Sequence, residues 1–324
     1  MKLFDHFPTP RFLTLADAGI SISSRNVRYI SFSSGKKGEL HVRQSGDIPL
    51  PEGVVSKGEV KDKQKLIEVL SKLSKEQGFK FINATLPEER AYLYTTTIDR
   101  VPYRDLRDAV AFTLEENAPL SLSESIFSFE VIDGPSEMRA AVSVIPANVA
   151  QDYIDTLELA GLVPVAFDVE SQAIARALVK VGDERSHLII YLGHSRVGFY
   201  LVRDEAVQFS STLSLDVADS MNQETISILK TEIRKFFSFW SAKYESSDMP
   251  NQKVERIIVG GPWAKDEKLV SSIMSDVETP YALGNVWVNV CDIDKRLPEI
   301  PFDTSLAYAA AIGAALGESY RQYV

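Results

Sequence analysis

The chain has 324 residues, of which 45% are hydrophobic and 25% charged, as expected for a soluble globular protein with more than one core. A net charge of −10 argues against a nucleic-acid or anionic-membrane surface, and the single cysteine, Cys291, excludes a disulfide framework and a cysteine-built zinc site. There is no membrane-spanning apolar run and no signal peptide after Met1, so we expect a cytoplasmic protein.

The first quarter of the chain predicts strands followed by a helix. Leucine and isoleucine side chains recur at helical spacing over residues 62–77, and Gly78 follows as a stop signal. The β-rich runs around this helix predict strands at 12–15, 26–32, 39–42 and 79–85.

Residues 90–165 are typical of a compact α+β unit inserted into a larger domain. The order is strand, helix, strand, strand, helix, and such a unit can be stable by itself. We expect strands at 91–98, 126–132 and 138–145, and helices at 103–117 and 147–160. A further strand at 163–167 and a helix at 170–178 follow.

The second half opens with a hairpin over residues 188–202. An apolar strand leads into a tight turn at Gly193, and a second strand returns. We expect a strand at 207–214, a long helix at 224–244, a strand at 256–259 and a closing helix at 305–317. Both halves begin with strand, glycine/serine turn and strand, which favours a two-lobed α/β fold with a cleft between the lobes.

Five long stretches, taken in order and at their spacing, resemble the PilM family of type IV pilus assembly proteins. They are residues 46–62, 84–99, 101–120, 168–178 and 284–294. The resemblance covers nearly the whole chain. It implies an actin-like (ribonuclease H-like) fold of two lobes around a nucleotide cleft, with an inserted α+β module in the first lobe. The first lobe would comprise 1–89 plus 166–185, the inserted module 90–165, and the second lobe 186–324.

The resemblance also marks the cleft, where two acidic positions are changed. Ser21 and Tyr191 stand where the family's two phosphate loops carry aspartates, although a rival register over residues 17–19 exists for the first loop. Glu170, at the position of a water- or metal-positioning carboxylate, is retained. The nucleotide-contacting positions assigned in this way are Ser21, Ser23, Glu170, Gly193, Ser195, Gly260 and Gly261.

These changes predict a cleft that does not catalyse ATP hydrolysis. Mg²⁺ is normally held through one or two carboxylates together with substrate phosphates, and neither serine nor tyrosine replaces that charge. In the adenosine-binding segment Pro262 removes a backbone N–H and Trp263 fills space. We therefore expect no Mg²⁺ site and no catalytic residue, and we leave ATP binding open. Glu170 is interpreted equally well as a helix cap or as a remnant of a catalytic site.

The resemblance implies a scaffold of the type IV pilus machine, or of a related secretion or DNA-uptake system, that captures the N-terminal cytoplasmic tail of a PilN-like membrane protein. Such a protein would lie at the inner face of the cytoplasmic membrane, with pilus motor ATPases and the membrane platform protein as further partners. The expected anchors of the groove are Tyr92, Leu93, Tyr94 and Phe112. Core packing of the insert is the alternative for them, since strand alternation prevents all from facing one groove.

Two enzyme hypotheses compete with the scaffold. The first is a nucleotide-switched actin-like ATPase that hydrolyses ATP or polymerises. The second is a carbohydrate or acetate kinase on the same superfamily fold, which would need intact phosphate-loop carboxylates that this sequence lacks.

Overall fold

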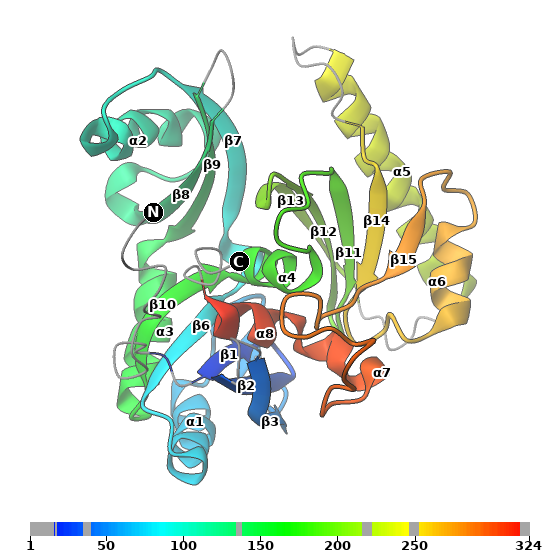
Figure 1. The fold of residues 1–324 in the computed structure, drawn as a ribbon. Helices are drawn as coiled ribbons and strands as arrows, with labels where there is room; N and C mark the ends of the chain where they lie inside the picture. Colours follow the sequence, from blue (N-terminus) through cyan, green and yellow to red (C-terminus); the bar gives the residue numbers. More distant parts are fainter. Residues whose placement is uncertain are drawn as a thin grey trace.

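The protein has two lobes, each built around a five-stranded sheet (Figure 1). The computed structural model describes residues 16, 18–34, 40–133, 138–215, 222–245 and 253–317, so the strand predicted at 12–15 lies outside the described residues. Within these ranges no helix has the length and apolar character that a membrane span requires.

The first-lobe sheet has the strand order β10-β6-β1-β2-β3. A meander of antiparallel strands, β1 (Ala18–Ile22), β2 (Asn26–Ser34) and β3 (Leu40–Pro49), continues through the parallel strands β6 (Phe81–Leu86) and β10 (Val163–Val169). A small hairpin of β4 (Val55–Ser56) and β5 (Glu59–Val60) precedes helix α1. The sheet therefore ends in an edge strand, β10.

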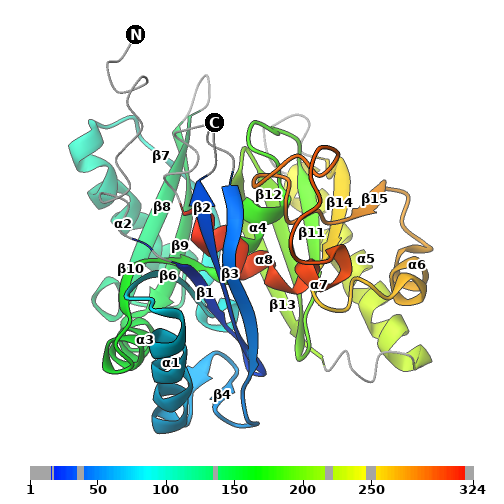
Figure 2. The same cartoon turned by 60° about the horizontal axis from the view of Figure 1, so that its bottom comes forward.

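Helices α1 (Lys63–Gln77) and α3 (Ala147–Leu159) pack beside each other on the first lobe (Figure 2). Asp62 caps α1 by accepting a hydrogen bond from the Lys65 backbone N–H, and Gly78 ends the helix in the left-handed conformation. The buried leucines of α1 share one core with Tyr153 and Leu157 of α3.

The inserted unit is a three-stranded sheet covered by one helix. The strand order is β7 (Tyr92–Ile98), β9 (Met138–Pro146) and β8 (Ser125–Asp133). Helix α2 (Leu106–Asn117) packs on one face of this sheet. The short 3-10 turns η5 (Tyr103–Asp105) and η6 (Leu122–Glu124) precede and follow the helix. The expected boundary of 165 is corrected, because α3 packs into the first-lobe core and β10 completes the first-lobe sheet.

The other face of the insert sheet touches the second lobe. The Thr95 hydroxyl donates a hydrogen bond of 3.1 Å to the Gln208 carbonyl, and Ile132 and Ala141 pack against Ala206. The insert is therefore braced against strand β13 as well as attached to the first lobe.

The second-lobe sheet has the order β13-β12-β11-β14-β15. The predicted hairpin is present as β11 (His187–Leu192) and β12 (Arg196–Arg203), followed by β13 (Ala206–Ser214). Strands β14 (Arg256–Gly260) and β15 (Tyr281–Leu283) run parallel to β11. Helices α5 (Gln223–Glu245) and α6 (Glu267–Met274) lie on the side of the sheet away from α4 (Figure 1).

Two helices connect the lobes. Helix α4 (Glu170–Leu178) follows β10, and the chain closes through α7 (Phe302–Ser305), η8 (Leu306–Tyr308) and α8 (Ala309–Leu316). A Cβ atom on Gly313 of α8 would lie 1.7 Å from the Ala173 carbonyl oxygen of α4, so the two helices touch through their backbones. Asn83 of β6 donates to the Ala314 carbonyl at 3.0 Å, which places α8, expected in the second lobe, against the first.

Candidate functional site: the cleft between the lobes

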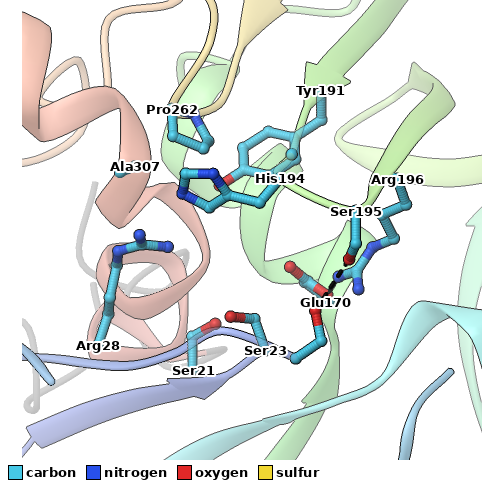
Figure 3. A pocket seen from close by; sticks show the side chains of 12 residues that line it. Ser21, Ser23, Arg28, Glu170, Tyr191, His194, Ser195, Arg196, Pro262 and Ala307 are labelled. Atoms are coloured by element: carbon cyan, nitrogen blue, oxygen red, sulfur yellow. Dashed lines mark hydrogen bonds and ion pairs between the residues drawn. The ribbon is translucent and has the colours of Figure 1, made fainter. Parts of the chain in front are cut away.

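The cleft between the lobes closes over a small polar cavity (Figure 3). Its walls come from the β1–β2 turn, the first residue of α4, the β11–β12 turn and the segments around Pro262 and Ala307. The space open to a water-sized sphere is about 30 Å³, whereas ligand pockets usually measure ~300–1,000 Å³. The cavity is therefore much smaller than a usual ligand pocket.

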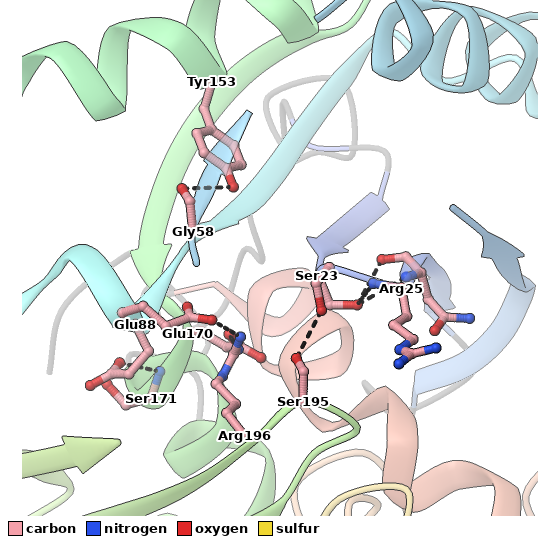
Figure 4. Close-up of polar contacts among 12 residues, drawn as sticks. Ser23, Arg25, Gly58, Glu88, Tyr153, Glu170, Ser171, Ser195 and Arg196 are labelled. Carbon is pink, nitrogen blue, oxygen red and sulfur yellow. Dashed lines mark hydrogen bonds and ion pairs between the residues drawn. The ribbon is translucent and has the colours of Figure 1, made fainter. Parts of the chain in front are cut away.

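A buried arginine occupies the centre of the site. Arg196, the first residue of β12, donates from one guanidinium nitrogen to Glu89 and from the other to Glu170 (Figure 4). Glu89 follows strand β6 of the first lobe in the turn η4 (Glu88–Arg90), and Glu170 begins α4. Arg196 is 8% exposed and Glu170 is 5% exposed, so the ion pair between them is shielded from water, whereas Glu89 is partly exposed.

Three carboxylates surround this one guanidinium. The pKa of Glu170 is raised to about 7, chiefly by burial and also by the neighbouring Glu89 and Glu88, while Arg196 opposes the shift. Burial also raises the pKa of Glu88, which accepts a hydrogen bond from the Ser171 backbone N–H at 3.2 Å. Burial by itself would lower the pKa of Arg196, but Glu170 and Glu89 raise it, so the arginine stays charged. The cation of this site is thus supplied by the protein.

Tyr191, which the resemblance aligns with the second phosphate-loop aspartate, lines the cavity. Its ring reaches into the cavity beside His194 (Figure 3), and the residue is 5% exposed. Burial and the charge of Glu170 raise the pKa of the Tyr191 hydroxyl to about 12, so the side chain is neutral at physiological pH. It therefore adds volume without charge.

The serine hydroxyls of both turns are engaged within the protein. Ser23 Oγ donates to the Asn26 carbonyl and accepts from the Asn26 N–H, both at 3.0 Å, which closes the β1–β2 turn. The hydroxyl oxygens of Ser24 and Ser195 share a hydrogen bond of 2.9 Å across the cleft. These groups would have to break existing bonds to contact a phosphate.

Five of the seven predicted nucleotide-contacting residues line the cavity. They are Ser21, Ser23, Glu170, Gly193 and Ser195. Gly260 and Gly261 lie outside its lining; a Cβ on Gly261, whose φ is +95°, would stand 2.5 Å from the Leu192 carbonyl oxygen. Their role here is close packing of β14 against β11, and the next residue, Pro262, reaches the cavity.

The sequence did not point to Arg196 or Glu89. Neither belongs to a recognisable motif, and their meeting requires the β11–β12 turn and the end of β6 to face each other across the cleft. Arg28, also in the cavity wall, donates to Asp47 at 2.8 Å and is thereby occupied. Within the described ranges, no group of three histidine, cysteine, aspartate or glutamate side chains is placed to hold a metal ion.

The four expected partner anchors divide into two pairs. Leu93 is 8% exposed and packs into the large core that includes the second-lobe sheet, and the Tyr94 hydroxyl lies 3.4 Å from Thr113 Oγ1 under helix α2. Leu93 is therefore corrected from an anchor to a core residue, since the insert is braced on the second lobe. Tyr92 and Phe112 are at the surface, 40% and 85% exposed.

Two sheet edges with exposed apolar side chains lie on the side of the molecule where the insert meets the first lobe. Val163 and Val165 on the edge strand β10 are exposed, as is Leu159 near the end of α3. Ile126 and Val131 on the edge strand β8 are exposed as well. Helix α3 contacts both β8 and β10, so the two edges belong to one region of the surface (Figure 1).

Comparison with known proteins identifies relatives of this arrangement. The family described as type IV pilus assembly protein PilM matches residues 19–215. Among solved structures, a chain of the PilM–PilN type IV pilus biogenesis complex is 19% identical, with a TM-score of 0.76 over 93% of this chain and 98% of that one. This likeness shows the two-lobed, actin-like fold that the sequence predicted.

More distant structures share less of the geometry. Ethanolamine utilization protein EutJ from Carboxydothermus hydrogenoformans is 10% identical, with a TM-score of 0.49 over 93% of this chain and 89% of that one. The cytoplasmic domain of EpsL, an inner membrane component of the type II secretion system of Vibrio cholerae, is 11% identical, with a TM-score of 0.44 over 75% and 80% of the two chains. No curated protein sequence matches the chain significantly.

Proposed function

The chain belongs to the PilM family of type IV pilus assembly proteins, and we propose that it serves this machine as a non-catalytic scaffold. In this proposal the scaffold is held at the inner face of the cytoplasmic membrane by the N-terminal tail of a PilN-like protein. Pilus motor ATPases and the membrane platform protein are proposed as its further partners.

The observation that carries the non-catalytic part is the place of Arg196. Phosphoryl transfer depends on positioning and on neutralising charge, chiefly through metal-organising carboxylates. Here Ser21 and Tyr191 replace two such carboxylates, and the retained Glu170 is bound to a guanidinium of the same chain. A group neutralised in this way is not free to orient water or a metal. Arg196 joins Glu89 of the first lobe to Glu170, a link that a bound nucleotide and metal would otherwise supply.

Tail capture is supported by the open edge of β10. An extended peptide gains affinity from main-chain hydrogen bonds when it adds to a sheet edge, and specificity from side-chain pockets. Strand β10 pairs with β6 on one side, and its exposed Val163 and Val165, next to Leu159, offer apolar contacts to an added strand. The exposed side chains of Tyr92 and Phe112 remain the proposed anchors on the insert.

The test is direct binding of a synthetic peptide that carries the N-terminal tail of the PilN-like protein from the same genome. We expect equal affinity with Mg-ATP, with EDTA and without nucleotide, and no release of phosphate. The variant Val163→Asp is expected to weaken binding at least ~10-fold, because an added strand would bury the new charge. Leu297→Asp is the matched control, since Leu297 is an 88% exposed aliphatic side chain of the second lobe.

Two results would contradict the proposal. Failure of every such tail to bind would remove the scaffold role. Mg-dependent phosphate release, abolished by EDTA and by Glu170→Gln, would instead establish a nucleotide-switched ATPase.

A further inference from the structure

We infer that the second lobe holds a separate binding site for a phosphate-type oxyanion, at the strand ends remote from the cleft. A cavity of about 260 Å³ lies there, between the C-terminal end of α4, the first residues of β11 and β14, and the segment after β15. Its floor is aliphatic, and its polar lining consists of Lys180, Asp183, Arg185, His187, Arg256 and Asn285.

This cavity is distinct from the cleft. His187 begins β11 and lines the cavity, whereas Tyr191 near the end of the same strand lines the cleft. Four residues of strand separate them by about 13 Å. Helix α4 likewise places Glu170 in the cleft and Leu178 at the cavity.

The charge of the lining is positive in a protein whose net charge is −10. Three cations face one carboxylate, and that carboxylate, Asp183, already accepts two hydrogen bonds from the Arg185 guanidinium, at 2.8 and 2.6 Å. Neither Lys180 nor Arg256 forms a salt bridge with any residue that the structure describes. Lys180 is near enough to Asp292 to lower the pKa of that carboxyl, but neither the Lys180 ammonium nor the Arg256 guanidinium is held in a salt bridge, so both can contact a ligand.

A buried histidine supplies the second, independent sign of a ligand. His187 is 1% exposed and its Nε2 lies 3.2 Å from Asp183 Oδ2, but its Nδ1 has no hydrogen-bond partner among the described residues. A buried polar atom without a partner is costly. His187 and Arg256 are paired across β11 and β14, so both side chains lie on the same face of the sheet as Ile258 in the cavity floor.

The C-terminal end of helix α4, which lies near this cavity, repels an anion less strongly than a helix end with uncovered carbonyl groups would. The C-terminal carbonyls of a helix carry partial negative charge. At α4 they are covered by Asn289, whose amide donates to the carbonyls of Arg176 and Val179 at 2.8 and 2.7 Å. Apart from Asp183, which is paired with Arg185, the side chains that line the cavity are donors and aliphatic groups.

These features fit a phosphate group with an apolar substituent. Lysine and arginine bind phosphate through charge-assisted hydrogen bonds, the amide of Asn285 adds a neutral donor, and His187 Nδ1 becomes a donor when the ring takes up a proton. The aliphatic floor suits the organic part of an ester. The same chemistry is offered by a soluble phosphate monoester and by a phospholipid headgroup.

The test uses imidazole NMR, because the chain has only four histidines. Inorganic phosphate is titrated into the full chain at constant ionic strength, alongside glycerol phosphate and vesicles of anionic phospholipid. We expect a saturable shift of the His187 signal, a rise of its pKa in the bound state, and at least ~10-fold weaker binding in Lys180→Gln/Arg256→Gln. Arg104→Gln, which removes an exposed arginine of the insert, is expected to bind as the parent does.

The arms of the experiment separate the outcomes. Tighter binding of glycerol phosphate assigns a soluble ester, and binding to vesicles alone assigns a lipid headgroup; both support the site. No saturable His187 shift with any of the three probes, or a shift of equal affinity in the double variant, would overturn it. Circular dichroism of the double variant checks that its fold is intact.

Discussion

Removing the Arg196 guanidinium is the sharpest perturbation of the cleft. In Arg196→Ala, Glu170 and Glu89 would lose the cation that now joins them across the lobes. Breaking a buried ion pair by deleting one partner typically costs about 3–5 kcal/mol, because the remaining charge is left unpaired. We expect a loss of this size at pH 8, where Glu170 without its cation must either stay charged and unpaired or take up a proton.

The loss of stability in Arg196→Ala depends on pH, because the pKa of Glu170 is shifted in the folded protein. Its pKa is raised in the folded protein from 4.5 to about 7, so this group stabilises the fold below its unfolded pKa, and that stability is lost as pH rises through the folded value. The buried Glu170 therefore makes the parent protein less stable as pH rises from 5 to 8. Without Arg196 the pKa of Glu170 rises further, so the loss extends to higher pH, and the variant is least affected near pH 5.

Urea unfolding followed by tryptophan fluorescence between pH 5 and 9 measures this difference. The double variant Arg196→Ala/Glu170→Gln is expected to recover most of the lost stability at pH 8, because it removes the unpaired charge. Lys65→Ala, at a surface pair, is the control and should leave stability unchanged. If Arg196→Ala is as stable as the parent at pH 8, or if the double variant is no better than the single one, the reasoning about the cleft is refuted.

Three other predictions concern the helices between the lobes and the cleft. Gly313→Val should lower the free energy of unfolding in urea by more than about 3 kcal/mol, because a Cβ would stand 1.7 Å from the Ala173 carbonyl oxygen. The control is Gly53→Val, where nothing lies within 4 Å of a Cβ but φ is +83°, so that the substitution should cost only backbone strain. Arg176→Ala should cost about 3–5 kcal/mol, since it breaks two buried hydrogen bonds to Asp168, at 2.7 and 2.8 Å, and leaves that carboxylate unpaired. Ser21→Asp/Tyr191→Asp should not bind Mg-ATP in calorimetry unless Arg196→Ala is added; binding by the double variant would show that the arginine does not block the site.

The sequence predicted the long, strongly periodic elements well and the short ones poorly. The helix expected at 62–77 is observed as Lys63–Gln77, and the hairpin at 188–202 as strands β11 and β12. Helix α6 and strand β15 were missed, because an eight-residue helix and a three-residue strand show too little periodicity. The N-cap Asp266, which accepts from the Lys268 and Leu269 N–H groups, was the local signal for α6.

The sequence predicted where the cleft lies, but it did not predict the ion pairs inside it. Resemblance located Ser21, Tyr191 and Glu170, and all three line the cavity. The fate of Glu170 depended on Arg196 and Glu89, which are distant in sequence and meet only through the fold. Leu93 shows the same limit: strand alternation indicated two faces for β7, but only the structure shows that one of them is covered by the second lobe.

The contact of the insert with strand β13 is a second connection between the two lobes, in addition to the ion pairs of Arg196. Thr95 and Ile132 join the insert to the second lobe at one place, and Arg196 joins the lobes at another. Because these contacts lie at separate places, rotation of one lobe against the other about either place would break the contact at the other. In the proposed scaffold, movement would therefore have to come from the partner proteins, because opening the cleft requires both contacts to break.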